Sequence, residues 1–227
     1  MIPEIEISSN EYNPIYDLVK AVHKYYPIGL NEPNDFYAGY QQLKGILAEK
    51  INKLMANSLP AECLRLEEDT QSLFKNYPVL NSYHRQFPNY ALDIKLPDKK
   101  YPEIQLSYHL KIRISLLTNY YTLFFEEVAL HKNIMRSLIS LNPMVSYAVS
   151  STLVGIDGSQ KMIENMKNVI QTHFPNHQFV NHNLLMLRKM HGGYPHGTDP
   201  NPYNNENSFY NFLFDNEYST FNLSIGV

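Results

Sequence analysis

Residues 104–116 alternate strictly between apolar and polar side chains, and this pattern constrains the fold more than any other part of the chain. In the segment IQLSYHLKIRISL every even position is large and apolar, and every odd position is polar or charged. A period of two places successive side chains on opposite faces of a β-strand. The segment therefore predicts a strand with one buried face and one face exposed to solvent.

A second alternating segment predicts a partner for that strand. Three apolar side chains alternate with two charged ones over residues 92–96, LDIKL, and residues 97–100, PDKK, have the composition of a turn. We therefore expect an antiparallel hairpin between 92–96 and 103–117. A further turn at residues 118–119 is expected to lead into a strand over 120–127, where Glu126 and Glu127 end the strand or start a helix.

The first 80 residues have the apolar spacing of helices. Pro14 suits the first position of a helix, where its missing N–H is harmless, and apolar residues at 15, 18, 19 and 22 then share one face. Similar stripes predict helices over 34–57 and from 60 to 77. These helices are the available cover for the apolar face of the long strand. The predicted fold class is α+β, an antiparallel sheet with a long central hairpin covered on one face by N-terminal helices.

The remaining chain mixes helix and strand patterns. Residues 190–207 are rich in Gly, Pro, Asn and His, a composition that predicts a long exposed loop. The other expected elements are helices over 128–141 and 160–174 and strands over 144–156, 179–187 and 218–225.

Length and composition are those of an ordinary globular chain. With 227 residues, of which 44% are hydrophobic, the protein is long enough to bury a substantial core. We expect one α+β domain over residues 1–227, with a helical sub-region over 1–80 and a sub-region of mixed sheet and helix over 88–227.

Charge and cysteine content bear on the compartment and the partners. The net charge of -3 gives no bulk attraction to nucleic acid or to anionic membranes, so neither is an expected partner. The single cysteine, Cys63, excludes an internal disulfide framework and fits a reducing compartment. The N-terminus MIPEIE carries acids where a secretory signal has bases, and no apolar run approaches the ~20 residues that span a bilayer. We expect a cytoplasmic protein.

Residues 152–163, TLVGIDGSQKMI, followed by FVNHN at 179–183, resemble part of a class I S-adenosylmethionine-dependent methyltransferase. In that family an acidic residue at the end of the strand binds the ribose of the cofactor, and the resemblance implies this role for Asp157, with Ser159 beside it. The glycine-rich turn of the family has no counterpart, since residues 123–151 contain no glycine. The alternative interpretation is a β–turn–α connection in which Asp157 or Ser159 caps the helix.

The histidines suggest a second chemistry. Five of the nine histidines fall between residues 173 and 196. His191, His196 and Asp199 offer two imidazoles and a carboxylate in one loop, which are suitable ligands for zinc or iron. Their spacing matches no standard metal motif, and the alternative is that these side chains are simply solvated.

Familiar catalytic and nucleotide-binding motifs are absent from the sequence. It contains no G-x-G-x-x-G, Walker A, G-x-S-x-G or C-x-x-C motif. The polar face of the long strand carries His109, Lys111 and Arg113, a positive strip suited to an acidic surface on another protein. We therefore expect a non-catalytic intracellular protein-binding module, of the immunity, adaptor or assembly-subunit kind, that uses no cofactor. Two alternatives stay open, a degenerate or divergent methyltransferase-like enzyme around Asp157 and Ser159, and a metal-binding protein using His191, His196 and Asp199.

Overall fold

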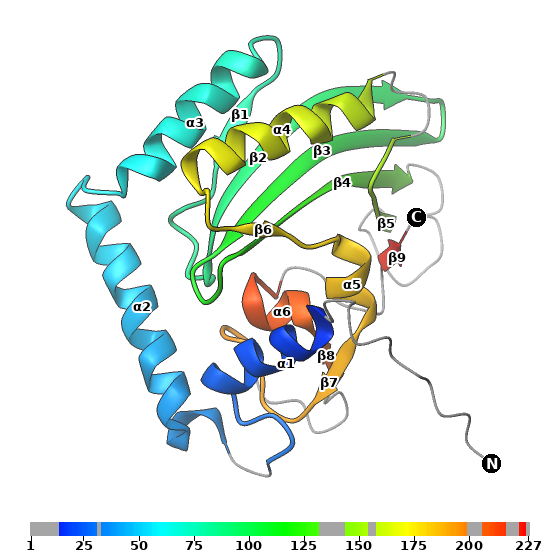
Figure 1. The fold of residues 1–227 in the computed structure, drawn as a ribbon. Helices are drawn as coiled ribbons and strands as arrows, with labels where there is room; N and C mark the ends of the chain where they lie inside the picture. The colour runs from blue at the N-terminus through cyan, green and yellow to red at the C-terminus, as the bar shows by residue number, and fades with distance from the viewer. Residues whose placement is uncertain are drawn as a thin grey trace, which may run out of the picture.

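The fold is α+β, as the sequence predicts, and its centre is a largely antiparallel sheet (Figure 1). The computed structural model describes residues 14–30, 33–131, 144–153, 158–198, 206–216 and 223–225. Neighbouring strands of the sheet follow the order β1-β2-β3-β4-β5-β9, and β6 pairs with β4. These strands are β1 (Val79–Asn81), β2 (Asn89–Lys100), β3 (Ile104–Ser115), β4 (Tyr120–His131), β5 (Met144–Ser150), β6 (Gln178–Phe179) and β9 (Leu223–Ile225).

Helices flank this sheet on both sides, and a small second sheet pairs β7 with β8. None of the helices in the described residues is long and apolar enough to cross a bilayer. The helices are α1 (Pro14–Tyr25), η1 (Asn34–Phe36), α2 (Ala38–Met55), α3 (Ala61–Leu73), α4 (Ser159–His173), α5 (His182–Leu187) and α6 (Phe209–Leu213), and the short strands are β7 (Lys189–His191) and β8 (Glu206–Ser208).

The predicted hairpin is present as β2 and β3. Leu92 pairs with Ile112 and Ile94 with Leu110, so the apolar positions of both strands share one face. The register shifts between Leu96 and Lys99, and this bulge lets β2 continue through residues 97–100, which the sequence pattern assigns to the turn. The chain reverses instead between the end of β2 and the start of β3.

Two expected elements are wrong. The helix expected over 128–141 is strand at residues 128–131, because β4 continues in register with β3 as far as His131; residues 132–143 lie outside the described ranges. The strand expected over 179–187 is two residues of β6 followed by α5. The side chain of Asn181 accepts a hydrogen bond from the Asn183 N–H and starts that helix.

The two faces of the sheet bury separate apolar cores. On the face formed by the even-numbered residues of β3, α3 and α4 cover side chains such as Leu110 and Ile112. On the opposite face α1, α5 and α6 pack around Phe124, on the other side of the sheet from α3 and α4 in Figure 1. N-terminal helices therefore cover the sheet as predicted, but later helices share both faces with them.

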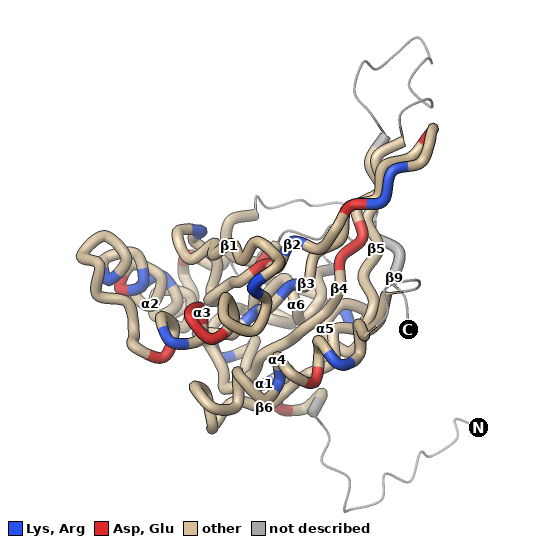
Figure 2. Tube along the Cα trace, turned by 90° about the horizontal axis from the view of Figure 1, so that it is seen from above, with Lys and Arg blue, Asp and Glu red and all other residues tan. Residues whose placement is uncertain are grey.

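The helices leave one end of the sheet extended. Viewed from above, the joined ends of β2 and β3 reach beyond the body of the molecule, with the ends of β4 and β5 beside them (Figure 2). Charged residues of both signs lie along this extension. The covered half and the extended half of the same strands are therefore different environments.

Candidate functional site

The odd-numbered face of β3 is divided into a buried half and an accessible half. Lys111 and Arg113 are only 5% and 1% exposed, so the prediction that they face solvent is wrong. The His109 side chain retains 21% of its exposure. The structure therefore brings the three predicted partner-binding residues together on one strand, but only His109 reaches the surface.

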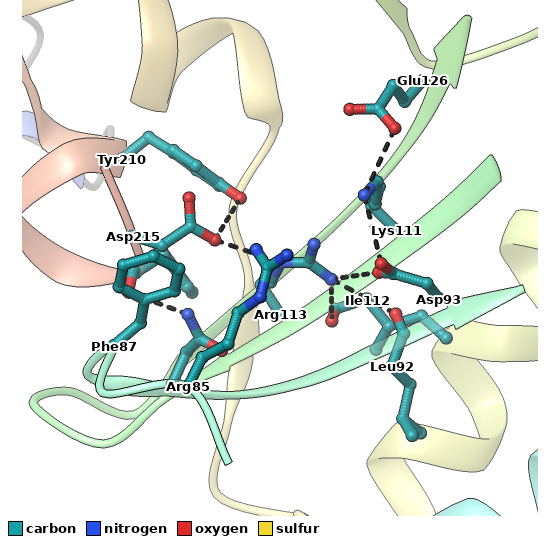
Figure 3. A network of polar contacts seen from close by, with 12 residues as sticks. Arg85, Phe87, Leu92, Asp93, Lys111, Ile112, Arg113, Glu126, Tyr210 and Asp215 are labelled. Atoms are coloured by element: carbon teal, nitrogen blue, oxygen red, sulfur yellow. Dashed lines mark hydrogen bonds and ion pairs between the residues drawn. The ribbon is translucent and has the colours of Figure 1, made fainter. Parts of the chain in front are cut away.

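Arg113 joins the central hairpin to the C-terminal part of the chain (Figure 3). Its Nη1 donates to Asp93 Oδ1 at 2.6 Å, and its Nε donates to Asp215 Oδ2 at 3.3 Å. Two carbonyls of the hairpin also accept from Nη1, at 3.0 and 3.3 Å. Asp215 follows α6 and accepts a second hydrogen bond from the Tyr210 hydroxyl at 3.0 Å. A buried guanidinium needs several acceptors of this kind to compensate for lost hydration.

Lys111 extends this network across the sheet. Its Nζ lies 3.1 Å from Asp93 Oδ2 and 3.2 Å from Glu126 Oε2. Glu126 belongs to β4, where it pairs in register with His109, and His109 Nδ1 lies 3.5 Å from Glu126 Oε2. Three adjacent strands therefore contribute charges of alternating sign, the arrangement that favours cross-strand pairing.

The cations of this network favour the ionised form of Asp93. Burial alone would raise the pKa of Asp93, but Arg113 and Lys111 outweigh that effect and lower the pKa below its usual range. The side chains of Arg113 and Asp215 are shielded from solvent, with exposed fractions of 2% and 1%. The network is therefore placed to fasten the segment after α6 onto the sheet. A partner that contacted Lys111 or Arg113 directly would have to displace the chain that covers them.

The accessible half of the same face combines apolar and polar side chains. Val145 and Tyr147 on β5 are 38% and 39% exposed. They pair in register with Leu130 and Val128 of β4, which in turn pair with residues 105 and 107 of β3. Residues that pair in register point to the same side of a sheet. We call this surface the distal face, formed by Gln105, Ser107, His109, Val128, Leu130, Val145 and Tyr147.

The sequence pattern does not identify three acidic residues of the buried network as site residues. Asp93 lies opposite Lys111 in the observed register, but the turn expected at residues 97–100 would place it opposite an earlier part of β3, so the expected hairpin does not predict this contact. Glu126 is expected to end a strand or start a helix, whereas it lies inside β4. Asp215 gave no signal, because its contact with Arg113 spans 102 positions of sequence.

The methyltransferase-like motif forms a strand–loop–helix connection. Asp157 lies outside the described residues. Ser159 is buried as the first residue of α4, and its Oγ accepts a hydrogen bond from the Leu153 N–H at 3.3 Å. The helix cap is Gly158, with φ +79°, so the prediction that Ser159 caps the helix is wrong. In a dinucleotide-binding fold, the helix connects two neighbouring parallel strands. Here α4 connects β5, which is antiparallel to β4, with β6, which is parallel to β4. The two strands joined by α4 are therefore not a parallel pair.

The histidine loop packs against the N-terminal part of the chain over residues 190–198. Met190 is a buried residue of β7, which pairs with β8, so the prediction of an exposed loop is wrong for this part. Gly192 has φ +84°, and a Cβ there would lie 2.9 Å from the Gly29 nitrogen, a close approach that requires glycine.

The predicted metal ligands are only partly described. His196 is half-buried, with Nδ1 3.1 Å from the Tyr40 hydroxyl, and burial lowers its pKa. His191 is exposed at the end of β7, and Asp199 lies outside the described residues. Within the described ranges, no group of three or more His, Cys, Asp and Glu residues is arranged to hold a metal ion.

Comparison of the chain with known protein families, with curated proteins and with solved structures found no match. The function is therefore inferred from the geometry of the two halves of the β3 face. One half is a buried charge network that connects distant parts of the chain. The other half is the accessible distal face.

Proposed function

We propose that this protein is a non-catalytic, cytoplasmic protein-binding module whose contact surface is the distal face. The observation that carries the proposal is the exposure of Val145 and Tyr147, 38% and 39%, on one side of β5. They lie in register with Leu130 and Val128. Exposed apolar side chains scattered singly are ordinary, whereas adjacent ones with polar neighbours are typical of contact surfaces.

The composition of the distal face indicates the kind of partner. Tyr147 provides a large amphipathic contact area at a low cost in conformational entropy, as tyrosines do in many interfaces. Gln105, Ser107 and His109 supply hydrogen-bonding groups on the β3 side of the face. The partner we propose is another protein that presents an apolar ridge to β4 and β5 and polar groups to β3.

The buried network supports this role by making the face rigid. Lys111 and Arg113 hold β2 and β3 to β4 and to the segment after α6. A contact surface on fixed strands loses less conformational freedom when a partner binds. A rigid scaffold of this kind requires no substrate and no cofactor, and Lys111 and Arg113 act by positioning the strands rather than by contacting the partner.

The test is quantitative capture of partners from a native-host lysate by three purified proteins, the wild type, Tyr147→Glu and Phe36→Glu. Phe36 is 78% exposed in η1, away from the sheet, so its substitution is the matched control. We expect a stoichiometric partner that the wild type and Phe36→Glu retain and that Tyr147→Glu loses at least about tenfold, since a buried charge is costly in an interface. Equal capture by all three proteins, or capture of no partner, would refute the proposal.

A further inference from the structure

A cavity of about 430 Å³ is lined by residues of α1 and of the turn between β3 and β4. Its walls come from three separate elements, namely α1, the turn itself and the connection from α4 to β6. The polar side chains that line it are Asp17, Lys20, Lys24, Thr118, Asn119, Asn176 and Gln178. Its volume lies within the range of small-molecule sites. It shares no residue with the distal face.

Two of these side chains place positive charge on one wall. Lys20 and Lys24 are one helical turn apart on α1, where like charges repel each other. Their Nζ atoms lie over the rings of Tyr16 and Tyr25, 4.2 and 5.0 Å from the ring centres. In the described part of the chain neither ammonium has a carboxylate within ion-pair distance. An anion held between them would relieve the repulsion and gain charge-assisted hydrogen bonds.

The remaining polar groups suit hydroxyl groups. Asp17 and the amides of Asn119, Asn176 and Gln178 offer both acceptors and donors. The structure gives none of these four side chains a hydrogen bond within the described ranges. Thr118 Oγ1 is buried and is likewise without a hydrogen-bond partner among the described residues. The cavity therefore combines a cationic wall with several side chains that are available to bind a polar ligand.

Backbone hydrogen bonds form the cavity in advance of any ligand. The Gln178 N–H donates to the Asn119 carbonyl at 2.8 Å, which joins the α4–β6 connection to the turn. β6 then continues in parallel register beside β4. α1 is anchored by Leu18 and Val22, both fully buried. Because the walls of the site are already fixed, little conformational entropy is lost when a ligand binds.

We propose that this cavity binds a small phosphorylated sugar or polyol, a property beyond the protein-binding role. Lys20 and Lys24 hold the phosphate group, because ammonium groups donate well to phosphate oxygens. Asp17 accepts hydrogen bonds from the hydroxyl groups of the ligand. This role accounts for a carboxylate beside Lys20 and Lys24 in the cavity wall. Asn119, Asn176 and Gln178 contact the other hydroxyl groups.

Calorimetric titration of the full chain tests this assignment with ribose 5-phosphate, glucose 6-phosphate and glycerol 3-phosphate. Inorganic phosphate and unphosphorylated ribose are the comparison ligands. We expect at least one of the three phosphorylated probes to bind about tenfold or more tightly than either comparison ligand. Inorganic phosphate lacks the sugar hydroxyl groups, and ribose lacks the phosphate group. No binding of any of the three probes, or binding no tighter than that of inorganic phosphate, would overturn the assignment.

Two double variants then locate the site. Lys20→Gln with Lys24→Gln should weaken binding of the phosphorylated probe about tenfold or more. Lys53→Gln with Lys75→Gln removes the same charge away from the cavity and should leave binding unchanged. Asn119→Ala should weaken binding of the sugar phosphate and leave that of inorganic phosphate unaltered. Equal effects of the two double variants would show a nonspecific response to charge and would contradict the proposed site.

Discussion

Arg113 is buried on a strand face that its sequence pattern assigns to solvent. Alternation identifies which residues share a face, and this is correct for β3 throughout its length. It does not show whether a later segment of chain covers that face. Arg113 is covered because Asp93 and Asp215 compensate its charge, and the second of these lies 102 positions away. At the scale of single residues, the sequence therefore predicts side-chain direction but not burial.

Removing the guanidinium tests how much the network contributes to stability. Arg113→Met keeps most of the side-chain volume and leaves the Asp93 and Asp215 carboxylates without a shared cation. We expect a loss of about 3–5 kcal/mol in the free energy of unfolding, the usual cost of breaking a buried ion pair on one side. Urea denaturation followed by circular dichroism measures it. Lys53→Met, which breaks an exposed pair with Glu49, is the control and should change stability little. Equal effects would show that Arg113 has no special structural role.

The lowered pKa of Asp93 makes a prediction about acid stability. A carboxyl whose pKa is lower in the folded than in the unfolded state stabilises the fold above its unfolded value, about 3.9. That contribution is lost as the pH falls through the lower folded value. Between about pH 6 and pH 3, the wild type should therefore lose more unfolding free energy than Asp93→Asn. The same slope in both proteins over that range would disprove the claim that Asp93 is paired as a carboxylate.

At the scale of elements, periodicity predicts long and strongly patterned segments correctly. The helix from Pro14, the helix over 160–174 and the hairpin are present, because their apolar spacing coincides with the faces that are buried. Short apolar runs are ambiguous between helix and strand. Residues 128–131 fit both patterns and form a strand because they pair with β3. Residues 182–187 form a helix because the Asn181 side chain caps it.

Two glycines in α2 look equivalent in the sequence and differ in the structure. A Cβ on Gly39 would overlap the Lys24 carbonyl of α1, whereas a Cβ on Gly45 would meet nothing within 4 Å. We expect Gly39→Ala to lose about 1–3 kcal/mol of stability through overpacking. Gly45→Ala should gain about 0.5–1 kcal/mol from its higher helix propensity. Thermal unfolding of both variants provides the comparison. A stable Gly39→Ala protein would show that α1 and α2 do not approach as closely as described.

At the scale of the whole molecule, the α+β class and the β2–β3 hairpin could be predicted, but the burial of both faces of the hairpin and the candidate site could not. The distal face exists because β5 joins β4 in a particular register and because the helices stop short of the end of the sheet. Neither property is encoded in local pattern. Of the predicted partner-binding residues only His109 lies on this face, and its direction follows from its alternation with the apolar positions of β3.

Hydrogen–deuterium exchange, with and without the partner obtained by capture, tests the proposed contact surface most directly. A bound protein slows amide exchange where it covers or stabilises the backbone. We expect protection concentrated in residues 105–109, 126–131 and 144–149, with little change in α2 or η1. Protection confined to the helices, with those strand segments exchanging as in the free protein, would contradict the claim that the distal face binds the partner.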